Sequence, residues 1–421
     1  MLFRSGGAGP PANPPTKPNV IIEDDIRGDI DGIQELAVAI WLHENNYINL
    51  LAFVINSGDT YSASTVKAVL NYNGLSSIPV YSYQGATDTG GTLYTQATAT
   101  NFRSQDGTNV GILNSGYSIT GGGTLYQVGD VLTVPGGTLA SGFSAATVTV
   151  TSVSSGAITG IRMSNSGSYS SAPSSPVTLP NPHSGTAATM TFTTGTWRGN
   201  YPDAQSALID LLNANSNIYW FNSGVSSVIY QFITNNSTLF ASKVSAYLVE
   251  AGWYPNNKFI GINAAEANYG TTPSQWNYIL ANWPSKTIPY IACGDENTTP
   301  LGSSGLIYGG PSDVLNKATD PVQYAFYTAG VNGETFVSGY LRPAWTFPCL
   351  LYLASGISPA GSGYAQYGYW GATGGTGTVD ASTGFNTYSN SWGFVSYMRI
   401  RAAYSTLNAL LVTIMAAISP G

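Results

Sequence analysis

The sequence predicts an α/β fold: a doubly wound, mostly parallel sheet into which a small antiparallel β domain is inserted. Along both outer parts of the chain, short β-branched strands alternate with amphipathic helices, the pattern of a parallel sheet covered by helices. Between about residues 108 and 193, runs of Thr and Val alternate with period two and are separated by Gly-rich turns, which predicts antiparallel strands. The α/β alternation returns near Trp197. We therefore predict an extended arm at 1–17, a body made of 18–107 and 194–421, and an inserted β module at 108–193.

The first strand and helix enclose an acidic turn. Val20–Ile22 has the composition of a buried strand, and apolar residues at 33, 36, 37, 40 and 41 follow helical spacing. Ligands bind at the carboxyl ends of strands in such folds. The cluster either binds a hard cation through oxygen ligands, or Asp29 or Asp31 caps the helix while the other carboxylates face water. It consists of Glu23, Asp24, Asp25, Asp29 and Asp31.

The remaining elements follow in order. We predict strands at 49–55, 78–83, 217–221, 245–250, 259–262 and 287–292, and helices at 62–72, 204–212 and 275–282. The last apolar run, 407–418, is too short to span a membrane. We expect it to pack into the core or into a subunit interface, and we expect the C-terminal helix and the arm to mediate assembly.

The composition restricts the class of protein. Charged residues make up 8% of the chain, against a usual ~25%, so hydroxyls and amides must cover the surface. A surface covered mainly by uncharged polar groups is typical of extracellular, virion or assembled proteins. A net charge of −7 with 14 basic residues argues against nucleic-acid binding. Cys293 and Cys349 are too few for a disulfide framework, and we interpret both as buried thiols.

The acidic turn resembles the metal-binding turn of the nucleoside hydrolase superfamily, written in some branches as Asp-Thr-Asp-Ile-Gly-x-Asp-x-Asp-Asp-Ala. Residues 23–33 read Glu-Asp-Asp-Ile-Arg-Gly-Asp-Ile-Asp-Gly-Ile. The similarity continues in order at 51–59, 78–81, 217–227 and 266–268, and at 345–353 and 369–375, which resemble the end of the sugar-binding branch. It implies Asp25 as the catalytic base, Glu23, Asp25 and Asp31 as ligands of Ca²⁺, and Glu266, Asn268 and Asp59 as substrate-binding residues.

The departures from the family pattern fall on the chemistry. Gly32 stands where the family has the second aspartate of the helix start, Trp345 where it has a late aspartate, and Arg27 where it has glycine. Losing two carboxylates and adding a guanidinium should weaken a Ca²⁺ site by several kcal/mol, at ~1–4 kcal/mol per close pair. We therefore expect a degenerate metal site and no cofactor, with Ca²⁺ as the candidate if one binds.

The inserted module resembles a β module of tailed-phage virion proteins. The similarity rests on residues 126–138, 148–158 and 167–173, which occur in that module's order and spacing. It implies a virion structural or surface protein, such as a head decoration or a tail or fibre component, located in the virion. The expected partners are other virion proteins, further copies of this chain and a host-surface glycan.

Two alternatives remain open. The first is an active, Ca²⁺-dependent nucleoside hydrolase in which Asp25 takes a proton from metal-bound water. The second is glycan binding by aromatic residues of a Gly-rich loop, although core or interface packing explains such residues equally well. We interpret His43 as a helix C-terminal cap and His183 as the one candidate acid–base group of the module. The aromatic candidates are Tyr364, Tyr367, Tyr369 and Trp370.

Overall fold

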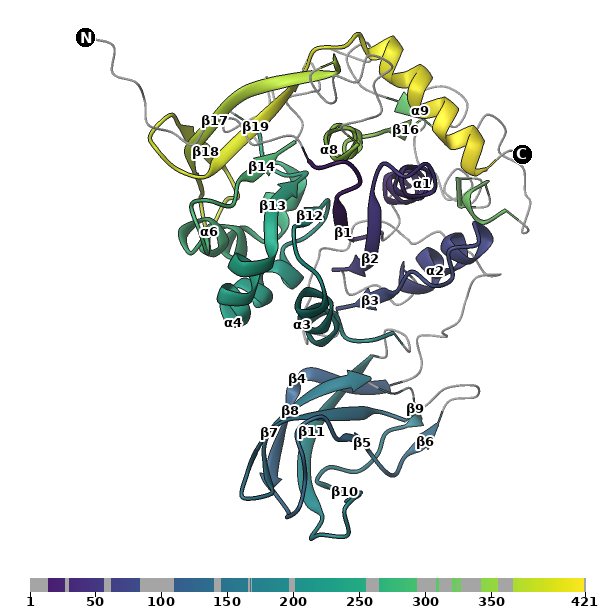
Figure 1. Cartoon of the computed structure of the whole chain (residues 1–421), viewed down its shortest axis with the longest axis vertical. Helices are drawn as coiled ribbons and strands as arrows, with labels where there is room; N and C mark the ends of the chain where they lie inside the picture. The colour runs from purple at the N-terminus through teal and green to yellow at the C-terminus, as the bar shows by residue number, and fades with distance from the viewer. Residues whose placement is uncertain are drawn as a thin grey trace.

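The computed structural model describes residues 14–26, 30–56, 62–83, 110–139, 145–165, 167, 169–196, 201–254, 265–293, 308–309, 320–323, 325–326, 342–354 and 366–419. A large sheet forms the centre of the body (Figure 1). Its strand order is β18-β17-β19-β14-β13-β12-β1-β2-β3, and every pairing from β3 to β19 is parallel. The strands are β1 (Asn19–Asp24), β2 (Asn49–Ile55), β3 (Val80–Ser82), β12 (Ile218–Asn222), β13 (Val244–Val249), β14 (Tyr290–Ala292), β17 (Gly368–Val379), β18 (Asn386–Ser389) and β19 (Val395–Ile400).

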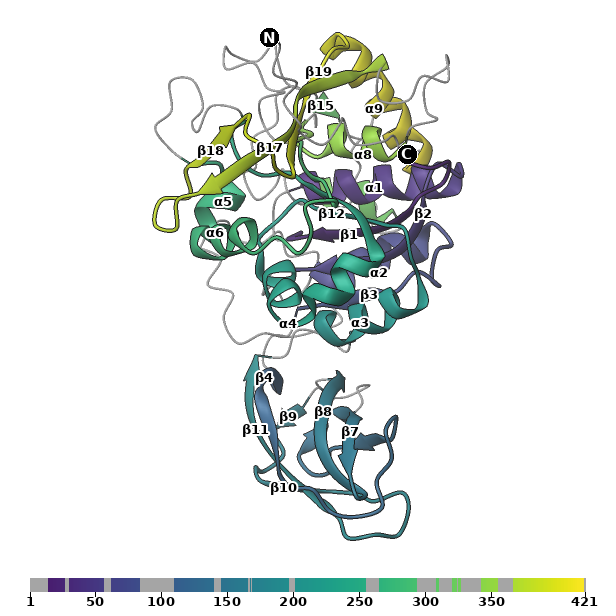
Figure 2. The ribbon, with the colours of Figure 1, turned by 60° about the vertical axis from the view of Figure 1, so that its left-hand side comes forward.

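Helices cover both faces of this sheet, which places an apolar core on each side (Figure 2). Alternate residues of β1 divide between the cores: Val20 and Ile22 face one, and Ile21 faces the other. The first face carries α1 (Asp31–Glu44), α2 (Ser62–Tyr72), α8 (Phe347–Leu353) and α9 (Tyr404–Ile418). The second carries α3 (Ala204–Ala214), α4 (Ser227–Lys243) and α6 (Pro273–Ala281). The short α5 (Ala267–Thr271) precedes α6, and β15 (Tyr308–Gly309) pairs with β16 (Arg342–Pro343). The predicted doubly wound α/β fold is confirmed.

Two small antiparallel sheets form the β module below the body in Figure 1. They have the strand orders β10-β11-β4-β9-β6 and β5-β7-β8 and enclose a core of their own. The entry strand pairs with the exit strand through Val110 and Thr196, so the two ends of the insertion lie together, as an inserted domain requires. The strands are β4 (Val110–Gly121), β5 (Val131–Thr133), β6 (Thr138–Leu139), β7 (Thr147–Ser154), β8 (Ala157–Asn165), β9 (Tyr169–Ser171), β10 (Val177–Leu179) and β11 (Ala188–Thr196).

One arginine joins the module to the body. Arg162 of β8 forms a bidentate ion pair with Asp210 of α3, with N···O distances of 2.9 and 2.6 Å, and donates a third bond to the Ser206 carbonyl at 3.1 Å. Three hydrogen bonds to one planar guanidinium fix its orientation as well as its distance from α3. The contact therefore sets how β8 lies against α3.

The apolar stripe of the C-terminal helix belongs to the core. Leu407, Leu411, Ile414 and Ile418 of α9 are buried in the same core as α1. The expected packing of this run into the core is observed, and a role of the helix or of the arm in assembly stays a prediction. In the described part of the chain, no helix is long and apolar enough to cross a membrane.

The interpretation of the two cysteines as free thiols is also wrong. Cys293, directly after β14, and Cys349 of α8 form a disulfide with a Cα–Cα distance of 5.6 Å. Both residues are fully buried. The bond ties the end of a central strand to a helix that packs on the first face of the sheet.

Candidate functional site

The candidate site lies at the carboxyl ends of β1, β2, β12 and β13. The chain runs from β1 to β2 and β3 on one side and later from β12 to β13 and β14 on the other. The direction of winding therefore reverses between β1 and β12, and ligands of doubly wound sheets bind at such a point. The acidic cluster begins within β1, whose last two residues are Glu23 and Asp24.

Glu23 is the buried centre of this edge. Its Oε1 accepts bonds from the side-chain amides of Asn56 and Asn222, each at 3.2 Å, and its Oε2 accepts one from Trp220 Nε1 at 2.8 Å. These donors come from the ends of β2 and β12. Burial raises the pKa of Glu23 to about 8, against the opposing effect of the donors. The side chain thus joins three strand ends through hydrogen bonds and is predominantly neutral near pH 7.

Asp24 fills the space above Gly32 at the start of α1. A Cβ placed on Gly32 would lie 2.6 Å from Asp24 Oδ2 and 2.7 Å from Ile26 Cγ1, closer than real Cβ contacts occur. The other oxygen of Asp24 accepts a 2.6 Å bond from the Asp25 amide. The departure at Gly32 is therefore a packing feature: the space for a longer side chain on α1 is taken by Asp24.

Asp25 and Asp31 lie at the rim of this edge, and both are half-buried. Asp31 is the first residue of α1, whereas the N-cap is Ile30, which makes no side-chain capping bond. The interpretation of Asp31 as the cap is wrong; its charge lies in the first turn, where the helix dipole favours it. Arg27, Asp29 and Asp59 lie outside the described residues.

Glu35 is a buried acid that the sequence analysis missed. It is 1% exposed. Burial, then the negative charge of Asp24, raise its pKa well above its usual range, and the hydroxyls of Ser223 and Thr346 oppose that rise. Glu35 thus lies between the end of β12 and the turn before α8. A sequence signal existed, because Glu35 is four residues after Asp31 and so shares its helix face.

Glu266 and Asn268 lie together beside the end of β13, but their polar atoms bond to the protein. Glu266 caps α5: Oε1 accepts from the Asn268 amide at 2.7 Å, and Oε2 accepts from the Gly252 and Tyr269 amides at 3.0 and 3.1 Å. Asn268 Nδ2 donates to both the carbonyl and Oε2 of Glu250 at 2.7 Å. Burial raises the pKa of Glu266. The substrate-binding role of this pair stays a prediction.

Only part of the expected Ca²⁺ site lies in the described residues. Ca²⁺ takes six to eight oxygen ligands; there, Glu23 accepts three hydrogen bonds from the protein and Asp24 Oδ2 lies above Gly32. Outside the gaps at 27–29 and 57–61, which hold Arg27, Asp29 and Asp59, no three His, Cys, Asp or Glu side chains of the described chain are arranged to hold a metal ion.

Two of the four aromatic residues considered for glycan binding, Tyr369 and Trp370, lie in strand β17 and not in a loop. Tyr367 is buried in the first core, and Trp370 packs edge-on against Tyr352 with ring centroids 5.6 Å apart. Tyr369 is exposed, with the guanidinium of Arg401 5.7 Å from its ring centroid. Tyr364 lies outside the described residues. Packing explains Tyr367 and Trp370, which leaves Tyr369 as the candidate among the described residues.

The two histidines also have structural partners. His43 is in the last turn of α1, but its Nδ1 accepts a bond from the Leu50 amide of β2 at 3.1 Å, and Asn45 is the C-cap. Burial, then the charge of Lys17, lower the pKa of His43, so a cationic cap is not its role. His183 pairs with Asp130 in the β module, with Nε2 3.0 Å from the carboxylate.

Comparisons with known proteins agree on the fold. No protein-family profile matches this sequence, and no curated protein sequence matches it. Among solved structures, a plant nucleoside hydrolase, PpNRh1, superposes with a TM-score of 0.51 at 14% identity and covers 96% of this chain and 100% of its own. The effector protein XOO4466 superposes with a TM-score of 0.50 at 11% identity, covering 97% and 95%. The body of this chain therefore has the nucleoside hydrolase-like fold.

Proposed function

We propose that this chain is a structural or surface protein of a phage virion, whose nucleoside hydrolase-like body does not hydrolyse nucleosides. The proposal has two parts that stand on different observations. The loss of hydrolysis is argued from the geometry of the acidic turn. The virion role is argued from the β module and the composition.

The observation that carries the first part is the packing of Asp24 over Gly32. A metal-dependent hydrolase needs carboxylates that converge on a cation, and this edge carries a glycine, with Asp24 above it, where the family motif has a further carboxylate. Without a metal, the water molecule that Asp25 would deprotonate has a pKa of 15.7. General-base assistance by a carboxylate raises the reaction rate only ~10²–10⁴-fold. That is too little for cleavage of an N-glycosidic bond. We therefore propose that the protein uses no cofactor. Ca²⁺ is the ion with which this part of the proposal is tested.

The second part rests on the module and the surface. The β module has its own core, and its sequence resembles a module of tailed-phage virion proteins. A chain with 8% charged residues suits a protein that is buried among others in an assembly. Other virion proteins and further copies of the chain are the proposed partners. A host-surface glycan is a further proposed ligand, with Tyr369 as the exposed aromatic.

The test of the first part is release of base from purine and pyrimidine nucleosides by the purified protein, with millimolar Ca²⁺ and with a chelator. We expect no release above buffer. The matched control is Asp25→Asn, which removes the candidate base and keeps its shape. Turnover that disappears both in Asp25→Asn and with the chelator would establish the alternative, an active nucleoside hydrolase, and overturn the proposal.

The second part is tested by mass spectrometry and immunogold labelling of purified particles of the phage that encodes the chain. We expect the protein in the particle at a fixed copy number. Absence from particles, with the protein present in the infected cell, would exclude the virion role and leave the result on hydrolysis unaffected.

A further inference from the structure

One face of β17 and β19 carries an exposed tyrosine beside two arginines. Tyr369 of β17 lies directly opposite Arg399 of β19 in the antiparallel pairing, so the two side chains point to the same face of the sheet. Arg401 lies two residues after Arg399, and its guanidinium carbon is 5.7 Å from the centroid of the Tyr369 ring. Tyr369 exposes 40% of its surface, Arg401 is exposed and Arg399 is half-buried. These three side chains, which we call the arginine–tyrosine patch, therefore form one continuous surface.

Packing of the two strands holds the patch in place. Trp370 and Met398, beside the patch in the two strands, lie opposite each other and pack in the first core. On the face of the patch, the guanidinium carbon of Arg399 is 5.9 Å from the centroid of the Tyr397 ring. That ring lies over Gly371, in the space that a Cβ at this position would need. The patch is thus preorganised, which lowers the entropic cost of binding a ligand.

This part of the chain is positively charged, although the protein as a whole is acidic. Residues 342–421 contain three arginines and one acid, Asp380, which gives a net charge of +2 in a chain with a total of −7. Two of those arginines belong to the patch. Asp380 follows the end of β17 that is remote from Tyr369. The patch therefore attracts an anionic ligand.

The patch offers such a ligand two kinds of contact. A guanidinium presents N–H groups whose geometry matches a carboxylate, with two parallel hydrogen bonds. An exposed tyrosine ring presents a flat face of negative π-electron density, against which the slightly positive C–H groups of a pyranose ring pack. A sugar that carries a carboxylate uses both contacts at once. Nucleic acid fits less well, because its affinity comes from many phosphate contacts and the patch has two cations.

We infer that the arginine–tyrosine patch binds a carboxylate-bearing sugar of a surface polysaccharide. The sugar ring packs on Tyr369, and the guanidinium groups of Arg399 and Arg401 bind the carboxylate. One patch binds weakly, and several copies on one particle strengthen the attachment. This inference deepens the glycan part of the proposed function and rests on it.

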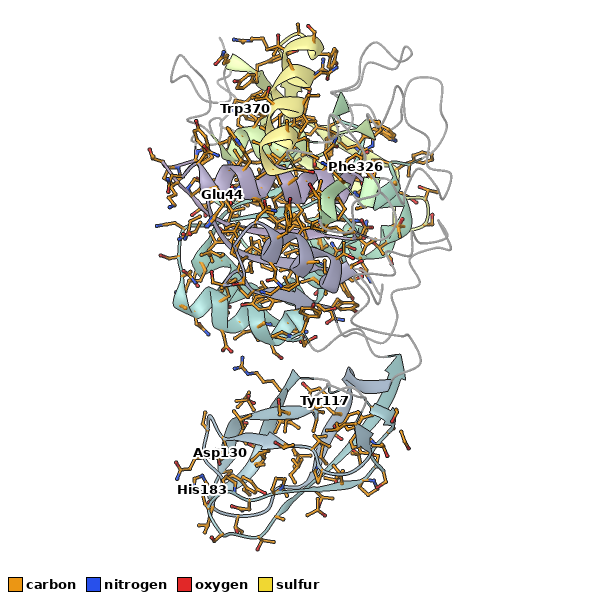
Figure 3. All side chains as sticks on the ribbon, turned by 90° about the vertical axis from the view of Figure 1, so that its right-hand side faces the viewer. Glu44, Tyr117, Asp130, His183, Phe326 and Trp370 are labelled. Atoms are coloured by element: carbon orange, nitrogen blue, oxygen red, sulfur yellow. A yellow bond between two sulfur atoms is a disulfide. The ribbon has the colours of Figure 1, made fainter. Side chains whose placement is uncertain are left out.

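The patch lies at the end of the molecule that is opposite the β module. Figure 3 shows Trp370, the residue after Tyr369 in β17, at the end of the body that is remote from Asp130 and His183 of the module. A chain that is attached to a particle through its module therefore directs the patch outwards.

The test is binding of the purified full chain to oligosaccharides of galacturonic, glucuronic and sialic acid, each compared with its neutral methyl ester, by surface plasmon resonance. We expect at least one acidic oligosaccharide to bind and its ester to bind at least about ten-fold more weakly. Arg401→Gln and Tyr369→Ala should raise the Kd by a similar factor. Arg401→Lys keeps the charge but loses the bidentate geometry, so it should also weaken binding. Tyr369→Phe keeps the ring and should bind like the wild type.

The matched control is Lys286→Gln. Lys286 is exposed and also lies over an aromatic ring, with its Nζ 4.4 Å from the centroid of the Trp392 ring. Its loss changes the net charge by the same amount as Arg401→Gln and should leave the Kd unchanged. Circular dichroism checks that each variant folds, which we expect because every altered side chain is exposed.

Three results would each overturn the inference: no binding of any acidic oligosaccharide by the wild type, equal binding of acid and ester, or an equal loss of affinity in Lys286→Gln. Tighter binding of single-stranded DNA of the same charge would overturn it in favour of nucleic acid. The nucleoside assay and the particle experiment use none of these sugars, so a failure here leaves their results unaffected. Sugar binding by a chain that is absent from particles would exclude the virion role alone.

Discussion

At the scale of single residues, Glu23 couples the stability of the body to pH. Its pKa is about 8 in the fold against 4.5 for an exposed glutamate, so the folded protein holds a proton that the unfolded chain releases. That stabilisation is complete below about pH 4.5 and is lost as the pH rises through about 8. At 1.36 kcal/mol per pKa unit, the loss is up to ~5 kcal/mol.

We therefore predict that the free energy of unfolding of the wild type falls between pH 5 and 8 more steeply than that of Glu23→Gln. Denaturant titrations at several pH values measure both slopes. Glu23→Gln also leaves one of the three donors without an acceptor, which lowers its stability at every pH. The prediction therefore concerns the slope, and equal slopes would contradict it.

A second prediction concerns the packing of Asp24 over Gly32. Gly32→Asp alone adds a carboxylate where a Cβ would already meet Asp24 Oδ2, so overpacking and like charge should destabilise the body by about 1–3 kcal/mol. Adding Asp24→Thr, the residue of the family motif, should recover most of that loss. Urea unfolding measures both variants. A single variant as stable as the wild type would show that Asp24 does not fill this space.

A further experiment tests which residues the expected Ca²⁺ site lacks. Calorimetric titration with Ca²⁺ should show binding by Asp24→Thr/Gly32→Asp/Trp345→Asp and none by the wild type. No binding by the triple variant would mean that these three positions are not sufficient to restore the site.

The sequence predicts which residues lie at this edge better than it predicts their contacts. Glu23 at the end of β1, Asp25 after it and Asp31 at the start of α1 stand in the order of the motif, because a strand–turn–helix pattern is local. The burial of Glu35 depends on Ser223, after β12, and on Thr346, before α8, which are distant in sequence. The Cys293–Cys349 bond was missed for the same reason, since two cysteines 56 residues apart give no spacing signal.

At the scale of elements, the disulfide between β14 and α8 should contribute to stability. It closes a loop of 56 residues, and loop-closure entropy for that length corresponds to about 4 kcal/mol. We predict that Cys293→Ala/Cys349→Ala loses about that amount in denaturant unfolding. Because both cysteines are buried, reductant added to the folded protein should act slowly. An unchanged midpoint in the double variant would contradict the prediction.

Helices and strands are predicted most accurately where their apolar residues are regularly spaced. The range 62–72 coincides with α2, and 49–55 with β2, because their apolar spacing is regular. The long helix α4 was not predicted: its second half begins with Asn235, Asn236 and Ser237, and Asn236 leaves helical geometry with φ −135°. Burial against β12 and β13 stabilises this helix more than its own propensity does. The predicted strand at 259–262 lies outside the described residues.

At the scale of the whole molecule, the β module should be separable from the body. The domain boundaries remain a prediction, although the module has its own core. Replacing residues 108–193 with a short Gly/Ser linker should leave one cooperative unfolding transition. The free energy of unfolding that the body loses when the module is removed should be close to the loss caused by Arg162→Ala in the full chain. That ion pair is partly exposed and is worth ~0.2–1 kcal/mol. A body that becomes insoluble or molten would show that the module is part of its fold.

The position of β12 beside β1 has a consequence for how the chain folds during synthesis. Glu23 of β1 and Trp220 of β12 are bonded to each other but are 197 residues apart. At ~5–20 residues per second, β1 leaves the ribosome roughly 10–40 s before its neighbour is made. The β module is translated in this interval and can complete its own core first. Meanwhile one edge of β1 has no strand beside it, and the nascent body is then most exposed to aggregation and most dependent on chaperones.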